Sequence, residues 1–144
     1  MQELPHSYSV NVTGQVDTNL TTSADGLPNI YVAPPLQFGG PGDQWSPEEL
    51  LMAAVANCFV LSFKAIARAS KVEWLSIDCE SEGILEKSGR KMLFTKVITK
   101  AKLAISSGQN SEAAEKALKR AEETCLITNS MSAEASLKYE VIEH

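Results

Sequence analysis

The fold is decided by residues 46–70, SPEELLMAAVANCFVLSFKAIARAS. Ser46 is a favoured helix N-cap, Pro47 suits the first helical position, and Glu49 follows the cap by three residues, as in a capping box. No Gly or Pro interrupts the stretch that follows. The pattern therefore predicts one helix from Pro47 to about Ser70, roughly 36 Å long at 1.5 Å per residue.

This helix is predicted to be buried on all sides, because every residue from Leu50 to Leu61 except Asn57 is apolar. The apolar run is shorter than the ~20 residues that cross a bilayer, so we expect a central helix and no membrane contact. One chain offers only a sheet and one more helix to cover it. We therefore expect a homodimer, in which a second copy supplies the remaining cover.

Strands are predicted before the helix. Residues 7–13 alternate between apolar and polar side chains, and residues 30–32 form a short apolar run. Asp25 and Gly26 predict a turn between them. Residues 33–46 hold three Pro and three Gly, which indicates a loop leading into the helix.

More strands and a second helix are predicted after it. Alternation over 75–80 and 97–105, with a turn at Ser88–Gly89, predicts a hairpin or meander. Residues 111–125 carry apolar side chains on one narrow helical face, and 137–141 alternate as a last strand. The order predicts an α+β fold with an antiparallel sheet and a long buried central helix, in a single domain over residues 1–144.

Composition excludes several classes of function. The net charge is −5, and residues 1–63 contain no Lys or Arg, which argues against nucleic-acid binding. The first residues, MQELPHSYSVNV, resemble no secretory leader, and three widely spaced cysteines suit a reducing compartment, so we expect a cytoplasmic protein. His6 and His144 lie near opposite ends of the sequence and no C-x-x-C occurs, so we expect no metal site.

The three thiols carry most of the functional information. Cys58 is either a small core residue or a reactive thiol, since free cysteines are often simply buried. A second thiol, Cys125, favours the reactive interpretation, because a sulfenic acid on one cysteine can be captured by another as a disulfide. Whether the two touch depends on the fold. Cys79 shares a strand face with Leu75 and Ile77, and we interpret it as core packing.

Two segments resemble a known family. Residues 46–59, SPEELLMAAVANCF, resemble the signature helix of the OsmC/Ohr family (osmotically inducible protein C and organic hydroperoxide resistance protein). Residues 122–127, EETCLI, resemble that family's second cysteine segment, and the order of elements over residues 7–143 is similar.

The resemblance implies an intertwined homodimer with thiol peroxidase sites at its interface. By position, Cys58 would be the peroxidatic thiol and Cys125 the resolving thiol. Organic hydroperoxides would be the substrates and a dithiol, such as a lipoylated protein, the reductant. The implied turnover is ROOH plus dithiol giving ROH, water and disulfide, with no cofactor and no metal.

Glu48 matches the family acid that orients an arginine beside the reactive cysteine. Ten helical residues separate Glu48 from Cys58, about 15 Å of rise, so Glu48 would serve the partner's Cys58 or act through a bend. Its other interpretation is a favourable acid at a helix N-terminus. No arginine precedes residue 64, and Arg68 would replace it only through a partner helix. Burial among apolar side chains is expected to raise the pKa of Cys58.

Three interpretations thus stay open at the level of sequence. The first is a thiol-dependent organic hydroperoxide reductase that uses Cys58 and Cys125. The alternative is the same fold without peroxidase activity, sensing redox state or binding a small apolar ligand near Phe38, Trp45, Met52 and Phe59. A purely structural module with inert thiols is the third interpretation.

Overall fold

The computed structural model describes residues 1–144. The chain divides into two compact units, Met1–Leu51 and Met52–His144, and each is described by itself. The expectation of one domain over the whole chain stays a prediction.

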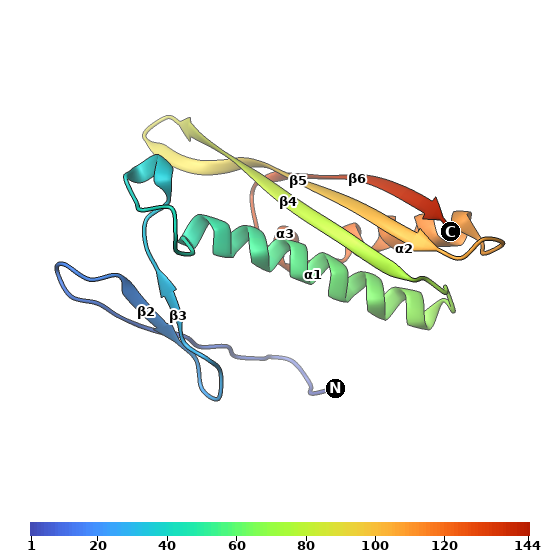
Figure 1. The fold of residues 1–144 in the computed structure, drawn as a ribbon, viewed down its shortest axis with the longest axis horizontal. Helices are drawn as coiled ribbons and strands as arrows, with labels where there is room; N and C mark the ends of the chain where they lie inside the picture. Colours follow the sequence, from blue (N-terminus) through green and yellow to red (C-terminus); the bar gives the residue numbers. More distant parts are fainter. The chain divides into compact units, whose positions relative to one another are not determined.

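The N-terminal unit is a small antiparallel sheet in the order β1-β2-β3, with β1 at Asn11–Thr13, β2 at Leu20–Ser23 and β3 at Ile30–Val32 (Figure 1). The predicted strand over 7–13 forms only at its end. The apolar side chain of Val10 before it is 71% exposed, so the alternation has nothing within this unit to pack against.

The loop over 33–46 follows β3 directly and ends at Ser46, the cap of the next helix. It contains a short 3₁₀ helix, η1 (Leu36–Phe38), and the Ala33 N–H donates to the Trp45 carbonyl at 2.9 Å. The Ser46 hydroxyl accepts from the Glu49 N–H at 3.1 Å and donates to the Glu49 carboxylate at 2.9 Å. The predicted cap at Ser46 is therefore confirmed.

The central helix, α1, spans Pro47–Ala69, within one residue of the predicted end. It stops in a Schellman motif, in which the Val72 N–H donates to the Ala67 carbonyl and the Lys71 N–H to the Arg68 carbonyl. Lys71 adopts a left-handed conformation, with φ of 56°.

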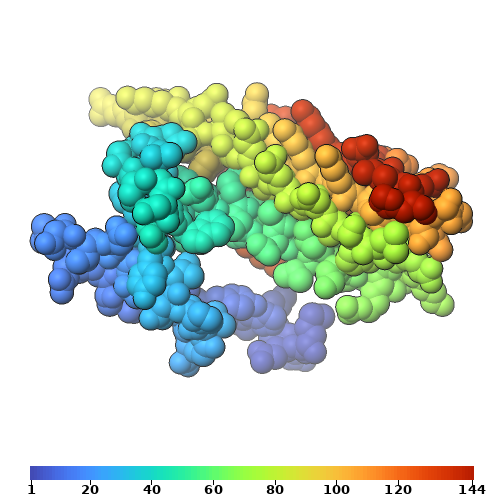
Figure 2. Space-filling view, in the orientation of Figure 1, coloured from blue at the N-terminus to red at the C-terminus, as the bar shows by residue number.

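The C-terminal unit is a three-stranded sheet in the order β4-β5-β6. Its elements are β4 (Ser76–Ser88), β5 (Lys91–Ile105), α2 (Ser111–Glu123), α3 (Leu126–Asn129) and β6 (Glu134–Glu143). Figure 2 shows β6 beside β5, although α2 and α3 separate these two strands in the sequence.

Strand direction differs within this sheet. The β4–β5 hairpin is antiparallel, as predicted, whereas β6 pairs with β5 in parallel. A parallel pair needs a crossover between its strands, and here α2 and α3 supply it. Alternation in a sequence marks a strand but does not encode its direction.

The core of this unit lies on the helix-bearing face of the sheet (Figure 1). It joins side chains of α1, β5 and α2: Phe59, Phe63, Ala67, Ala101, Leu103, Ile105, Ala114, Ala117, Leu118 and Ala121. The narrow apolar face predicted for the second helix is confirmed. The helix was predicted to end at residue 125, and α2 ends at Glu123.

The prediction that α1 is buried on all sides is wrong for the single chain. Only Val55, Phe59, Phe63 and Ala67 are buried, a stripe with a spacing of four residues. Leu61, on another face, is 64% exposed. Within the C-terminal unit, the sheet and α2 cover only one side of this apolar helix.

The expectation that α1 is too short for a membrane is also corrected, because the whole helix is long and apolar enough to cross one by length and composition. Core helices of soluble proteins pass the same test, and α1 carries a stripe of buried residues in this chain.

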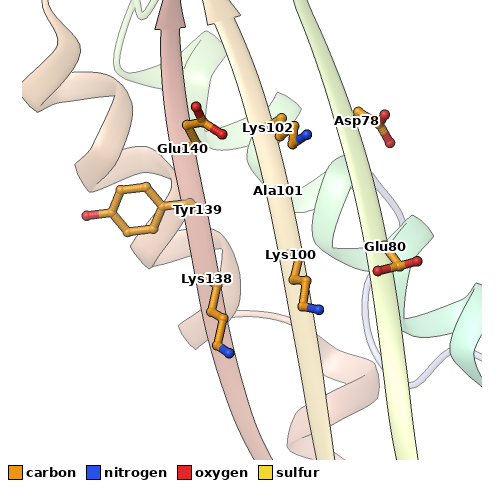
Figure 3. A pocket seen from close by; sticks show the side chains of 8 residues that line it. All are labelled: Asp78, Glu80, Lys100, Ala101, Lys102, Lys138, Tyr139 and Glu140. Atoms are coloured by element: carbon orange, nitrogen blue, oxygen red, sulfur yellow. The ribbon is translucent and has the colours of Figure 1, made fainter.

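The other face of the sheet is charged (Figure 3). Two cross-strand rows run over it, Asp78–Lys102–Glu140 and Glu80–Lys100–Lys138. They line an open hollow of about 470 Å³. Such a row of ionised side chains belongs in water, which explains why the helices pack on the opposite face.

Candidate functional site: a cluster of thiols

Two of the three thiols meet inside the C-terminal unit. Cys58 lies in the middle of α1, and Cys125 lies at the junction of α2 and α3. The Cys125 side chain lies near enough to Cys58 to lower the pKa of the Cys58 thiol, although 67 positions separate the two in the sequence. Both thiols are free.

The junction that presents Cys125 is built by a helix break. Thr124 ends α2, and its hydroxyl donates back to the Arg120 carbonyl at 2.8 Å. Cys125 then takes an extended conformation as the N-cap of α3. Its own carbonyl accepts from the Asn129 N–H at 3.0 Å, which fixes the first turn of α3. The first N–H groups of a helix have no partners within it, so those of α3 are free to bind elsewhere.

Two of these N–H groups act on the Cys58 thiol. Burial raises the pKa of the Cys58 thiol, but four hydrogen-bond donors act against it. They are the Ile127 N–H, the Cys125 thiol, the Leu126 N–H and the Ser62 hydroxyl. The balance lowers the pKa of Cys58 below its ordinary value of 9.0, because donors stabilise the thiolate.

The expectation of a raised pKa at Cys58 is therefore wrong. It rested on apolar neighbours along α1 and on the distance of Cys58 from the start of α1. Two of the donors belong instead to a different helix of four residues, α3, which the sequence pattern did not predict. The only sequence signal for it was Thr124, a residue that often competes with helical hydrogen bonding. Ser62, one turn after Cys58, was also missed.

The two thiols differ in access. Cys125 is 2% exposed, whereas Cys58 is partly exposed. A small oxidant arriving from solvent therefore meets Cys58 first.

Cys79 lies on β4, on the same face as Ile77, and packs against the core, as its interpretation from sequence required. Burial, the negative charge of Asp78 and the neighbouring Cys125 raise the pKa of the Cys79 thiol to about 11. The Cys79 thiol is thus protonated at neutral pH, in contrast to that of Cys58.

Neither Glu48 nor Arg68 is among the groups that shift the pKa of the Cys58 thiol. Glu48 lies in the first turn of α1, ten residues before Cys58, and its Oε1 atom is buried without a hydrogen-bond partner. Arg68 lies in the last turn and is exposed. No three His, Cys, Asp or Glu side chains are grouped as metal ligands.

One residue of the apolar pocket suggested by the sequence, Phe59, does not line a pocket. Phe59 is 1% exposed and belongs to the core, so it cannot line a ligand site. Phe38 and Trp45 are about half exposed and lie in the N-terminal unit.

The comparisons with known proteins agree with this architecture. A protein of Bacillus subtilis (strain 168) described as "Uncharacterized protein YmaD" is 27% identical over 134 residues, covering 90% of this chain and 84% of that protein. The solved structure of an OsmC-like protein of unknown function from Vibrio cholerae superposes with a TM-score of 0.83 at 25% identity, covering 96% of this chain and all of that one.

A further solved structure carries a functional description. An organic hydroperoxide resistance protein OsmC from Legionella pneumophila superposes with a TM-score of 0.76 at 25% identity, covering 97% of this chain and 99% of that one. The family described as OsmC-like protein matches residues 40–140. The chain is a member of the OsmC-like protein family, with the α+β fold of that family.

Proposed function

We propose that this protein is a thiol-dependent peroxidase that reduces organic hydroperoxides. The observation that carries the proposal is the Cys58 thiol: it is partly exposed, its pKa is lowered by hydrogen-bond donors, and it lies near a second thiol. The description of the Legionella relative as a hydroperoxide resistance protein supports the same class of substrate.

The proposed reaction begins with the Cys58 thiolate. It attacks one peroxide oxygen of ROOH, the O–O bond breaks, and RO⁻ takes up a proton and leaves as ROH. Cys58 becomes a sulfenic acid. The thiol of Cys125 then attacks that sulfur, releasing water and forming the Cys58–Cys125 disulfide. A dithiol, such as that of a lipoylated protein, reduces the disulfide and becomes oxidised itself.

The N–H donors of α3 supply part of the stabilisation of the Cys58 thiolate that a nearby cation would otherwise supply. The N–H groups of Leu126 and Ile127 favour the thiolate of Cys58 by direct hydrogen bonds. Ser62 adds a hydroxyl from the next turn of α1. Backbone donors are fixed before the reaction, so they need no reorganisation as charge develops.

We further propose that the active form is a homodimer. The uncovered side of α1, which includes the exposed Leu61, is the surface that a second copy would cover. Glu48 carries a buried carboxylate oxygen without a partner, and in the dimer it would act as a positioning residue for the partner's Cys58. The reduced thiols suit a cytoplasmic location.

The test is to treat the reduced protein with one equivalent of cumene hydroperoxide for seconds, then alkylate and map the thiols by mass spectrometry. We expect a Cys58–Cys125 disulfide with Cys79 still reduced at that time. Cys58→Ser should abolish consumption of the hydroperoxide, whereas the matched control Cys79→Ser should retain the first turnover.

Each outcome decides a part of the proposal. Activity in the Cys58→Ser variant would show that Cys58 is not the nucleophile. A Cys125→Ser variant should accumulate a persistent sulfenic acid, and normal multiple turnover in that variant would remove the resolving role. If all three thiols of the unmodified protein stay reduced, the fold serves the alternative, a sensor or binder without peroxidase activity.

A further inference from the structure

The short helix α3 differs from α1 and α2 in what holds it in place. It spans only Leu126–Asn129 and buries none of its side chains, and Leu126 is 65% exposed. Both α1 and α2, in contrast, have a stripe of fully buried side chains that belongs to the core. A helix this short is not stable by itself in water. Hydrogen bonds must therefore supply most of what keeps α3 folded.

These hydrogen bonds converge on Cys125. Its carbonyl accepts from the Asn129 N–H at 3.0 Å and from the Thr128 hydroxyl at 3.2 Å. The Asn129 side-chain amide also donates to the Glu123 carbonyl, at the end of α2, at 3.1 Å. Because Cys125 is the N-cap residue of α3, the orientation of this one residue determines whether the first turn of α3 forms.

The reduced state of Cys58 favours the folded state of α3. The N–H groups of Leu126 and Ile127 act on the Cys58 sulfur, and a thiolate is a strong acceptor because it is charged. The sulfur of a disulfide carries no charge and is a weak acceptor. Oxidation of Cys58 therefore removes a favourable interaction from the start of α3.

A disulfide between Cys58 and Cys125 also requires movement. Both thiols are free, and a disulfide brings two sulfurs to about 2.05 Å. Cys58 lies in the middle of the 23-residue helix α1, whose buried stripe is packed in the core. Cys125 precedes a helix without buried side chains. The displacement should therefore fall on the junction of α2 and α3, where less packing resists it.

We propose that α3 is a redox-responsive gate: the Cys58–Cys125 disulfide opens residues 124–130 and admits the dithiol reductant to the Cys125 sulfur. This rests on the proposed peroxidase function. In the reduced protein, Cys125 is 2% exposed, so a reductant has no path to its sulfur. The gate thus opens only when a disulfide is present to be reduced.

The reduction step that the gate serves is balanced. A thiolate of the dithiol attacks the Cys125 sulfur, the S–S bond breaks, and Cys58 leaves as a thiolate. The donors around Cys58 stabilise that thiolate, which makes it the better leaving group. The second thiol of the reductant then loses its proton and attacks the reductant's own sulfur in the mixed disulfide. Cys125 is released and takes up a proton, and α3 folds back on Cys58.

The experiment is hydrogen–deuterium exchange, read by mass spectrometry, on the full-length protein before and after one equivalent of cumene hydroperoxide. In the reduced protein the Asn129 and Ser130 N–H groups are hydrogen-bonded to the Cys125 and Leu126 carbonyls. We expect peptides that cover 124–130 to exchange about tenfold faster after oxidation, because this segment opens locally. Peptides of α2 over 112–121 should change little, and dithiothreitol should restore the original protection.

A second oxidant and a variant separate the disulfide from other oxidation products. Diamide converts thiol pairs to disulfides without a sulfenic acid, so it should open α3 in the unmodified protein as the hydroperoxide does. Cys125→Ser cannot form the disulfide, and α3 should stay protected in this variant after diamide. Brief treatment of the oxidised unmodified protein with 2-mercaptoethanol, stopped with acid, should place the mixed disulfide on Cys125.

The outcomes distinguish the gate from the peroxidase function. A mapped Cys58–Cys125 disulfide with unchanged exchange over 124–130 would refute the gate and leave the peroxidase intact. A mixed disulfide found on Cys58 alone would refute the access that the gate provides. Opening with diamide but no reaction with hydroperoxide would refute the peroxidase and support the redox response of α3. No disulfide with either oxidant would refute both proposals.

Discussion

At the scale of single residues, reactivity follows from which hydrogen-bond donors face a sulfur. Cys58 and Cys79 are both partly buried and both desolvated, yet the pKa of Cys58 is lowered and that of Cys79 is raised. The difference is that N–H and O–H groups point at Cys58, whereas a carboxylate, Asp78, lies near Cys79. Burial alone therefore does not predict thiol chemistry.

Ser62 offers a direct test of this explanation. Removing its hydroxyl in Ser62→Ala should raise the pKa of Cys58, because one donor to the thiolate is lost. Ser62→Thr keeps the hydroxyl and should restore the original value. The measurement is the rate of iodoacetamide modification of Cys58 as a function of pH. An unchanged profile in Ser62→Ala would remove Ser62 from the site.

Cys79 predicts a loss of stability at alkaline pH. Its pKa is about 11 in the folded protein against 9.0 for an ordinary thiol, so the unfolded chain loses this proton first as pH rises. The contribution of Cys79 to stability is complete below pH 9 and is lost as pH rises towards 11. The midpoint temperature of thermal unfolding should therefore fall less steeply between pH 9 and pH 11 for Cys79→Ala than for the unmodified protein. Parallel curves would contradict the raised pKa.

At the scale of elements, the end of α1 carries a local strain. Lys71 occupies the left-handed position of a Schellman motif, which glycine fills at no steric cost. Lys71→Gly should raise the free energy of unfolding by about 1 kcal/mol, as measured by urea denaturation. The control Lys64→Gly, at an exposed position inside α1, should lower it by about 1 kcal/mol. A destabilised Lys71→Gly variant would contradict this account.

The packing of α1 on the sheet depends on Gly83. A Cβ atom at this position would lie 2.8 Å from the Met52 sulfur and 2.9 Å from the Phe94 ring. Gly83→Ala should therefore destabilise the protein by about 1–3 kcal/mol, the usual cost of overpacking. Adding Met52→Ala should recover part of that loss, since it vacates the space. A double variant no more stable than expected from additive effects would show that the contact is not the cause.

At the scale of the whole molecule, the uncovered side of α1 predicts self-association. Leu61→Asp should shift the protein from a dimer to a monomer in sedimentation velocity, because it buries a charge in the proposed apolar contact. Ser136→Asp, on the charged face of the sheet, is the matched control and should leave the dimer intact. A monomeric unmodified protein would overturn the dimer.

The sequence predicts the parts of the fold that depend on local signals. Ser46, Pro47 and Glu49 give the start of α1 to the residue, and the turn at Gly89 gives the β4–β5 hairpin. These features depend on neighbouring residues, which a linear pattern contains. The parallel direction of β6 could not be predicted in this way, because it depends on where α2 and α3 return the chain.

The two thiols of the candidate site were predicted from motifs, whereas the environment of Cys58 was not. Cys58 and Cys125 were identified by motif, and their proximity came only with the fold. The sign of the pKa shift at Cys58 was missed because two of its donors are main-chain N–H groups, which every residue possesses and no side-chain pattern displays.

The order of these parts along the chain has a consequence for synthesis. The backbone donors of α3 follow Cys58 by more than 65 positions, so a ribosome translates Cys58 long before the groups that lower its pKa. A nascent chain that ends before residue 126 carries Cys58 without those donors. The Cys58 thiol therefore acquires its lowered pKa only after residues 126 and 127 have been translated and folded against it.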